Sequence, residues 1–544
     1  MSESGETTDE ESSLSPRTVS PRNVPPRDDA IRAVVEFIVC VTSMILLATT
    51  WIVEPFIVPS GSMATTLLGP HRRIVCRECG FAFDVGSDED DRAARVCCPN
   101  CEAVRDDVTE PVAKGDRLLV AKQAFRVRDP ARFEVAVFRR PGQAGQAYVK
   151  RIVGLPGESL LIRDGDLFID GQRVHKTLAE QRGLAVLVHD AAFESPEIPP
   201  AWHPSGGSSC WSARPGGRFQ AAAASDATLP GETSLPREPL NLPSSTTPSP
   251  LLAVEPTAAA AEAEAPRTTF SPRESRATNE ATRRPIHWLD YEHMVRPLAP
   301  HARSTPGPIV DRLAYNQIQR VQLLDEFDTT HDLLLRTKLA AAGEGAIYFR
   351  ANAGADQFFA EVHPDSGAVE LFHNGRRVAS GALPESLSGE TPKLVEWSVI
   401  DAQAVLAVEG RLCFAPYRWE PSGRAANSGV SPLAIGAQGP AVDVHELQVW
   451  RDVYYTDPYR RAGRPRGAVA WGVDAPYQLG PDEYFMLGDN SRYSEDSRLW
   501  PEGPGVPRSA MIGKAVVVHY PSRWMEWGAR SFHVPDWERI RYIR

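Results

Sequence analysis

The chain has 544 residues, with 59 Lys and Arg against 70 Asp and Glu, so its formal net charge is −11. The length leaves room for several domains, and the acidic balance argues against nucleic acid as a partner. The 40 Gly and 47 Pro exceed average usage, which predicts that part of the length is linker. Eight cysteines are too few for a disulfide-built scaffold. Five of them lie within residues 76–101, which favours one local metal site over a disulfide framework.

The N-terminal region divides into a polar tail and an apolar stretch. Residues 1–29 are rich in Ser, Thr, Pro and acids, a composition typical of a disordered tail. Residues 37–53 are 17 residues without a charge, and with their apolar flanks they reach the ~20 residues that cross a bilayer. A cleaved signal peptide is the alternative, but it should begin with a short basic region, and this start is long and acidic. We therefore expect an uncleaved transmembrane helix as anchor over residues 30–58.

The rest of the chain is expected to be mainly β, because short apolar runs alternate with Gly-containing turns. The expected parts are a β-rich domain split over residues 59–75, 102–203 and 460–525, a low-complexity linker over 204–285, a β-sandwich insertion over 305–456, and an aromatic and basic C-terminal tail over 526–544. The tail suits either a membrane interface or a plain packed terminal segment.

Two hydroxyl groups and one lysine carry the first chemical signal. Ser60 and Ser62 follow the predicted anchor within a few residues, and Lys150 stands in an apolar, strand-like segment. Burial disfavours a charged amine and lowers the pKa of lysine from ~10.4, so that a desolvated lysine can act as a general base toward a serine. Taken alone, each residue also suits a purely structural role: Ser60 and Ser62 as caps of a helix or turn, and Lys150 as an exposed charged residue on a strand.

Four segments that occur in a fixed order favour a catalytic role instead. They are residues 59–67 (PSGSMATTL), 115–120 (GDRLLV), 150–158 (KRIVGLPGE) and 488–498 (GDNSRYSEDSR). Together with the preceding apolar stretch they resemble the bacterial type I signal peptidases, which are membrane-bound Ser/Lys endopeptidases. The resemblance implies a β-rich catalytic domain in which Ser62 is the nucleophile and Lys150 the general base, with no cofactor for catalysis.

The same resemblance implies roles for the neighbouring residues. Ser60 would stabilise the oxyanion together with the Ser62 backbone N–H, and Ser494 would orient the lysine. Substrate-site and structural roles fall on Met63, Asp489, Asp496 and Arg498. The sequence departs from the family pattern at Thr65, where a proline is usual, and in its long insertions.

The resemblance also implies partners and a location. The substrates would be signal-peptide-bearing precursors cut after small residues (Ala-x-Ala), and the enzyme would be anchored in the cytoplasmic membrane lipid bilayer by a single span, with its catalytic domain on the extracytoplasmic side. A membrane-anchored binding or scaffold protein with an inactive peptidase core is the alternative. The joint presence of Ser62, Lys150 and Ser494 argues against it.

The cysteine cluster has the spacing of a zinc ribbon over residues 76–101. Cys76 and Cys79 form one C-x2-C pair and Cys98 and Cys101 another, with 18 residues between the pairs. Four thiolates leave no open position on a tetrahedral ion, so we expect structural Zn²⁺ rather than catalytic Zn²⁺. A pair of disulfides is the alternative, because an extracytoplasmic domain lies in an oxidising compartment.

The sandwich insertion is similar to the concanavalin-like jelly rolls around residues 399–410. That resemblance implies a carbohydrate or protein ligand, and many such domains only mediate contacts. Trp397 and Trp450 lie in apolar alternating runs, so they are expected in the core rather than on a sugar-binding surface.

Overall fold

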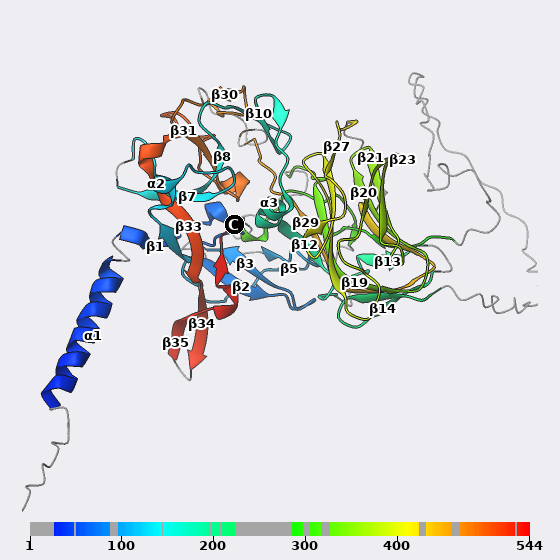
Figure 1. Ribbon diagram of the computed structural model, residues 1–544, viewed down its shortest axis with the longest axis horizontal. Helices are drawn as coiled ribbons and strands as arrows, with labels where there is room; N and C mark the ends of the chain where they lie inside the picture. Colours follow the sequence, from blue (N-terminus) through cyan, green and yellow to red (C-terminus); the bar gives the residue numbers. More distant parts are fainter. Residues whose placement is uncertain are drawn as a thin grey trace, which may run out of the picture. The chain divides into compact units, whose positions relative to one another are not determined.

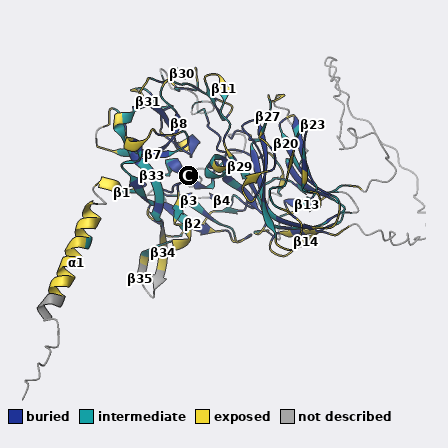
Figure 2. Cartoon of the chain, viewed as in Figure 1, coloured by how far each residue is buried: buried dark blue, intermediate teal, exposed yellow. Residues whose placement is uncertain are grey.

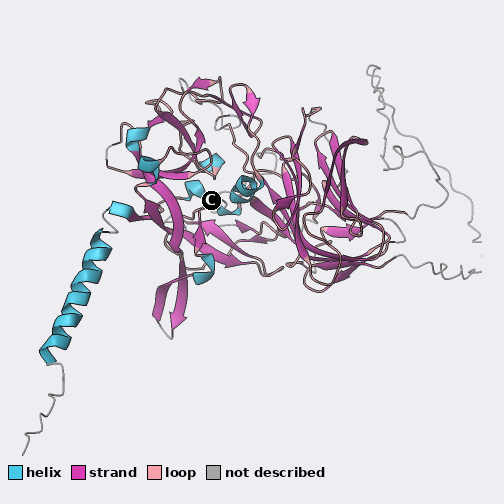
Figure 3. Cartoon of the chain, viewed as in Figure 1, coloured by secondary structure: helices cyan, strands magenta, loops and turns pink. Residues whose placement is uncertain are grey.

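The computed structural model describes residues 27–47, 51–87, 96–143, 145–195, 198–205, 209–223, 285–296, 304–316, 327–423, 431–457, 459, 468–527 and 530–543. It divides into two units, Met1–Glu54 and Pro55–Arg544. Most of the predicted N-terminal tail and of the predicted linker lies outside the described residues. Strands dominate the second unit (Figure 3), so the prediction of a mainly β chain is confirmed.

The first unit contains helix α1 (Arg27–Leu47), whose side chains are exposed along most of its length (Figure 2). The helix starts inside the predicted tail, and five of its first ten residues are charged. Within the residues that the structure describes, no helix has both the length and the apolarity to cross a membrane. The C-terminal end of the predicted anchor was wrong, because Val53–Ile57 forms strand β1 rather than helix. Its β-branched and aromatic residues favour a strand.

An eight-stranded sheet forms the centre of the split β-rich domain (Figure 1). Its strands are, in spatial order, β1, β6 (Arg117–Ala121), β33 (Met511–Tyr520), β7 (Val135–Arg139), β8 (Ala147–Gly154), β31 (Glu483–Leu487) and β32 (Gly505–Pro507), with β36 (Arg541–Tyr542) beside β33. Strands β8 and β31 are distant in sequence but pair antiparallel. A four-stranded sheet of β11 (Gln172–Arg173), β10 (Asp166–Ile169), β9 (Ser159–Arg163) and β30 (Tyr477–Gln478) accompanies it.

The insertion is a two-sheet β-sandwich with one continuous apolar core. The first sheet contains β14 (Trp211–Arg214), β15 (Arg218–Ala221), β29 (Ala441–Arg451), β19 (Leu333–Ala342), β24 (Lys393–Ile400), β25 (Gln403–Val408), β26 (Arg411–Leu412), β12 (Val186–Asp190) and β27 (Tyr417–Arg418). The second contains β13 (Trp202–Pro204), β16 (His287–Tyr291), β28 (Leu433–Gln438), β20 (Ala346–Ala353), β21 (Asp356–Val362), β22 (Ala368–His373) and β23 (Arg376–Ala382). Trp397 is fully buried in this core.

The sandwich begins earlier in the chain than the sequence analysis placed it. Strands β12 and β13 come from the stretch assigned to the catalytic domain, and β14 and β15 from the stretch assigned to the linker. Trp211 and Phe219 are buried in the sandwich core, although the polar composition around them indicated linker. Two short strands in a Ser- and Pro-rich segment give too few alternating residues for a pattern to emerge.

Small two-stranded hairpins accompany the two large β structures among the described residues. Hairpin β2 (His71–Val75) with β3 (Ala82–Gly86) and hairpin β4 (Val96–Cys97) with β5 (Val104–Arg105) carry the cysteine pairs. The predicted C-terminal tail contains part of a hairpin formed by β34 (Ser522–Trp527) and β35 (Arg530–Pro535). Its pairing starts before residue 526, so the tail does not begin where it was expected.

Candidate active site

The predicted nucleophile lies in a short turn that follows β1. Ser62 occupies the 3-10 helix η2 (Gly61–Met63), which is closed by the Ala64 N–H donating to the Gly61 carbonyl at 3.0 Å. Met63 is fully buried and packs in the core of the eight-stranded sheet. Because Met63 points into the core, its neighbour Ser62 is held at the surface, where it is partly exposed.

Lys150, on β8, is brought to hydrogen-bond distance of this serine. Its Nζ lies 2.5 Å from the Ser62 Oγ, and the residue is only 3% exposed. The pKa of Lys150 is lowered to about 8, chiefly by burial and also by the Arg498 guanidinium, while Asp496 and Asp489 act in the opposite direction. About a tenth of a lysine with this pKa is neutral at pH 7, which is enough to supply a general base.

The two other predicted serines differ in their contacts. Ser60 is exposed, and its Oγ donates to the Ser62 Oγ at 3.4 Å. The Ser494 Oγ is buried and has no hydrogen-bond partner among the described residues, so the expected bond to Lys150 is not made in this structure. Ser494 nevertheless lies beside the nucleophile, because a Cβ added to Gly488 would clash with both the Ser494 Oγ and the Ser62 carbonyl. Only glycine fits at this close approach.

Two buried ion pairs hold residues 488–498, the segment that carries Ser494. Arg498 contacts Asp496 through Nε at 2.9 Å and Nη2 at 2.7 Å, and both side chains are fully buried. Arg151 contacts Asp489 through Nε at 2.8 Å and Nη2 at 2.6 Å. Asp489 also accepts a hydrogen bond from the Thr66 hydroxyl at 2.5 Å. Arg151 is the neighbour of Lys150 in sequence, and its ion pair with Asp489 therefore also fixes the turn that carries Ser62.

Asn490 is a site residue that the sequence analysis missed. Its backbone N–H donates to the Ser62 carbonyl at 3.1 Å, and its Nδ2 donates to the Gly61 carbonyl at 2.9 Å. The residue is 1% exposed. Its position inside the 488–498 segment was the available signal, but an asparagine there also suits an ordinary turn.

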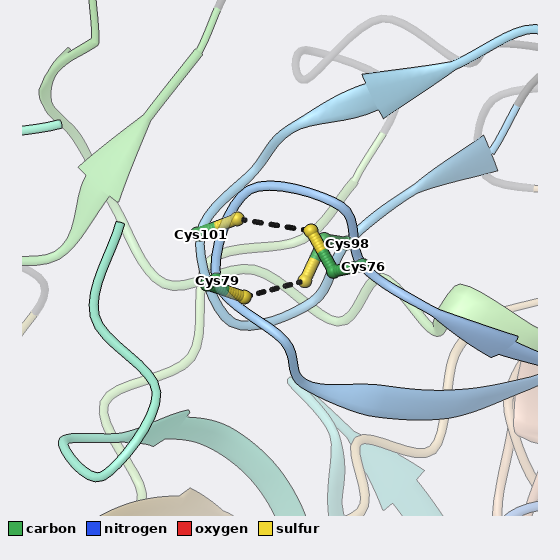
Figure 4. Close-up of side chains that lie close together, drawn as sticks. All are labelled: Cys76, Cys79, Cys98 and Cys101. Atoms are coloured by element: carbon green, nitrogen blue, oxygen red, sulfur yellow. Dashed lines mark hydrogen bonds between the residues drawn. The ribbon is translucent and has the colours of Figure 1, made fainter. Parts of the chain in front are cut away.

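The four predicted metal ligands meet in one place (Figure 4). Their sulfur atoms all lie within 4.8 Å of one another, with 3.6 Å between Cys76 and Cys101 and 3.7 Å between Cys79 and Cys98. A tetrahedron with Zn–S bonds of ~2.3 Å has S–S edges of about 3.8 Å, whereas a disulfide has S–S of ~2.05 Å. All four thiols are free. The donor set and its spacing therefore fit a metal ion held by four thiolates and do not form disulfides here.

The turns of the two hairpins explain how the thiols converge. Cys76 and Cys79 occupy the turn between β2 and β3, where the Gly80 N–H donates to the Cys76 carbonyl at 3.0 Å. The Glu102 N–H makes the equivalent bond to the Cys98 carbonyl, also at 3.0 Å, between β4 and β5. Each turn therefore aims two thiols at the same point, which is the arrangement that a structural zinc ion requires.

Comparison with known proteins identifies similar proteins for part of the chain. The family described as signal peptidase, peptidase S26, matches residues 99–199 and 406–520. Lys150 and Ser494 fall inside these stretches and Ser62 falls outside them. The signal peptidase I of Rickettsia akari is 26% identical over 141 residues, which cover 26% of this chain and 42% of that protein. The signal peptidase I of Pseudomonas fluorescens is 31% identical over 137 residues, covering 25% of this chain and 36% of that protein.

The chain thus spans less than half the length of these curated relatives. Among solved structures, it is similar to the carbohydrate binding module CBM66 from Bacillus subtilis, with a TM-score of 0.19 and 9% identity over 30% of this chain and 81% of that chain. A likeness this low says nothing about a ligand. The family match and the curated relatives agree with each other: over part of its length, the chain is similar to signal peptidases of the family peptidase S26.

Proposed function

We propose that this chain is a serine endopeptidase that removes signal peptides from exported precursor proteins by means of a Ser62/Lys150 dyad. The observation that carries the proposal is the 2.5 Å separation of the buried Lys150 Nζ and the partly exposed Ser62 Oγ. Burial lowers the pKa of Lys150 to about 8, so a neutral amine is available to the serine near neutral pH.

The geometry supports a mechanism in two stages. Neutral Lys150 removes the Ser62 hydroxyl proton, and the oxygen attacks the scissile carbonyl to form a tetrahedral intermediate. The Ser62 backbone N–H and the Ser60 hydroxyl stabilise the oxyanion. The lysine then gives its proton to the leaving amine, which leaves an acyl-enzyme on Ser62. A water molecule, deprotonated by the same lysine, hydrolyses that ester.

Ser494 has a proposed role in the protonated state of the base. Its Oγ is buried beside the Ser62 carbonyl and lacks a partner among the described residues. A buried hydroxyl without a partner is costly. A change of its rotamer as Lys150 takes up the proton would let it accept a hydrogen bond from the ammonium group, which would stabilise the charged form when it is needed.

The proposal includes substrates with small residues at the cleavage site and attachment to the cytoplasmic membrane, with the catalytic domain outside the cytoplasm. Support for attachment comes from α1, whose apolar side chains Ile31, Phe37, Ile38, Met44 and Leu47 are 55–69% exposed. Exposed apolar surface of this extent is typical of a lipid or protein contact. Sedimentation with membranes, and resistance of that association to alkaline carbonate, tests this part separately.

The decisive experiment is cleavage of a precursor with an Ala-x-Ala site by the purified full chain. Ser62→Ala and Lys150→Met should abolish cutting, because each removes one member of the dyad. The matched controls are Ser388→Ala and Lys338→Met, a serine and a lysine of the sandwich whose side chains bond the Pro364 carbonyl and Glu446. Both controls should cut as the wild type does. A folded wild type that cuts no precursor would favour the scaffold alternative, and cutting by Ser62→Ala would refute the dyad.

A further inference from the structure

A short segment of the insertion lies against the nucleophile turn. Residues 311–316, here called the strap, lie between the strands β18 (Thr305–Pro306) and β19 and end in the 3-10 helix η5 (Ala314–Asn316). They fall in the part of the chain that separates the two stretches matched by the signal peptidase family. The strap contacts the catalytic machinery through Asp311, Tyr315 and Asn316.

Asn316 forms a reciprocal amide pair with Asn490. The Asn316 Nδ2 donates to the Asn490 Oδ1 at 2.8 Å, and the Asn490 Nδ2 donates back to the Asn316 Oδ1 at 2.7 Å. The same Nδ2 of Asn490 donates to the Gly61 carbonyl at 2.9 Å. Asn316 therefore orients the Asn490 amide toward the Gly61 carbonyl, which the Ala64 N–H also contacts.

The Gly61 carbonyl sets the direction of the proposed oxyanion donor. It belongs to the same peptide unit as the Ser62 N–H, and in a planar trans peptide these two groups point in opposite directions. A hydrogen bond that fixes the direction of the Gly61 carbonyl therefore also fixes the direction of the Ser62 N–H. The next peptide unit is fixed as well, because the Asn490 backbone N–H donates to the Ser62 carbonyl at 3.1 Å. A preorganised donor is what oxyanion stabilisation needs.

The side chain of Tyr315 packs against the turn that carries Ser62. Its ring lies so close to Gly61 that a side chain at Gly61 would collide with it, and the ring also touches Gly86 at the end of β3. Tyr315 is 7% exposed, clusters with Ala64 and Leu68 on the same turn, and donates its hydroxyl hydrogen to the Pro70 carbonyl at 3.1 Å. The ring therefore fills the space between the nucleophile turn and the cysteine-bearing hairpin.

Asp311 fixes the other end of the strap. Arg492 donates to both of its carboxylate oxygens at 3.0 Å, and the Thr456 hydroxyl donates to Oδ2, also at 3.0 Å. The Asp328 backbone N–H donates to Oδ1 at 2.9 Å. Arg492 belongs to the same segment as Asn490, so the strap is attached to that segment at two points.

We propose that the strap makes the insertion part of the working peptidase, with Asn316 and Tyr315 acting as positioning residues for the Ser62 turn. Neither residue touches the reacting atoms; Asn316 acts through Asn490, and Tyr315 acts through Gly61. The inference rests on the proposed peptidase function. It predicts that damage to the strap lowers the rate of the chemical step and leaves substrate binding intact.

The test compares Asn316→Ala and Tyr315→Ala with Asn352→Ala, a sandwich asparagine whose Nδ2 donates to the Ser431 carbonyl at 2.6 Å. Cleavage is measured as separate kcat and KM values on an Ala-x-Ala precursor. We expect kcat to fall about tenfold in both strap variants, less than the ~100-fold or more that follows loss of an oxyanion donor itself. KM should stay within about twofold, the pH dependence should keep its midpoint near 8, and Asn352→Ala should match the wild type.

Amide hydrogen exchange over residues 60–68 gives a readout that needs no activity, and in both strap variants it should become faster there than in Asn352→Ala. Unchanged kcat with unchanged exchange would overturn the inference while leaving the peptidase function intact. A rise in KM alone would also overturn it, because the strap would then be a substrate contact. If the folded wild type cuts no precursor, the peptidase function fails, and the exchange comparison alone decides whether the strap orders the turn.

Discussion

Replacing Lys150 with Met should stabilise the fold while abolishing cleavage. The substitution keeps the length of an unbranched side chain and removes a charge from a site that is 3% exposed. Burial lowers the pKa of this lysine from 10.5 to about 8, and each tenfold change in proton affinity corresponds to ~1.4 kcal/mol, so the protonated folded state carries a cost of about 3 kcal/mol. Loss of the contact with Ser62 offsets about 1 kcal/mol. The net gain in unfolding free energy at pH 7 is therefore about 2 kcal/mol.

The pH dependence of this gain follows from the sign of the pKa shift. Between pH 8 and 10.5 the unfolded wild type binds more protons than the folded one, so wild-type stability rises with pH in that window and stays low beneath it. The advantage of Lys150→Met should thus be full below pH 8 and disappear as the pH approaches 10.5.

Urea unfolding of the full chain at pH 7 and at pH 10 measures this difference, with a probe that reports on the eight-stranded sheet. Lys338→Met is the control, since it makes the same change at a lysine that is 44% exposed. A Lys150→Met protein that is less stable than the wild type at pH 7, with a difference independent of pH, would refute the reasoning about burial.

Three further predictions follow from the contacts around the site. Asp489→Ala removes the carboxylate that neutralises the buried guanidinium of Arg151 and should cost ~3–5 kcal/mol of unfolding free energy; a change in melting temperature within error of zero would contradict the role of this pair. Gly488→Ala should lower kcat by ~100-fold, because the added Cβ collides with the Ser494 hydroxyl and the Ser62 carbonyl. A kcat equal to that of the wild type would show that the turn shifts to accommodate the methyl group. Metal analysis should find one zinc ion per chain and none in Cys98→Ser, since four free thiols meet at one point; a metal-free wild type purified without chelators would exclude the zinc site.

The sequence predicted the candidate site better than the architecture around it. Ser62, Lys150, Asp489 and Arg498 were expected at the site because four short segments in order resemble those of the type I signal peptidases. The structure brings those residues together. The Cys-x-x-Cys spacing likewise anticipated the convergence of four thiols, because each pair must occupy a tight turn.

Features that depend on long-range packing were not visible in the sequence. Asn316 carries no local signal, since an asparagine suits many kinds of turn, and only the fold brings it to Asn490. The early start of the sandwich was hidden for the same reason, because β14 and β15 are four residues each within a polar segment. The helix–strand boundary near Val53 was missed because one apolar stretch supplies both a helix and a strand at the sheet edge.

The pH dependence of precursor cleavage by the wild-type chain tests the central claim most directly. A base whose pKa burial holds at about 8 should make kcat/KM rise about tenfold between pH 7 and pH 9, as the neutral fraction of Lys150 rises from about a tenth to about nine tenths. Ser62→Ala should cut at no pH in this range. A flat profile, or a limb that rises only near the ordinary lysine value of 10.5, would contradict a buried lysine as the general base.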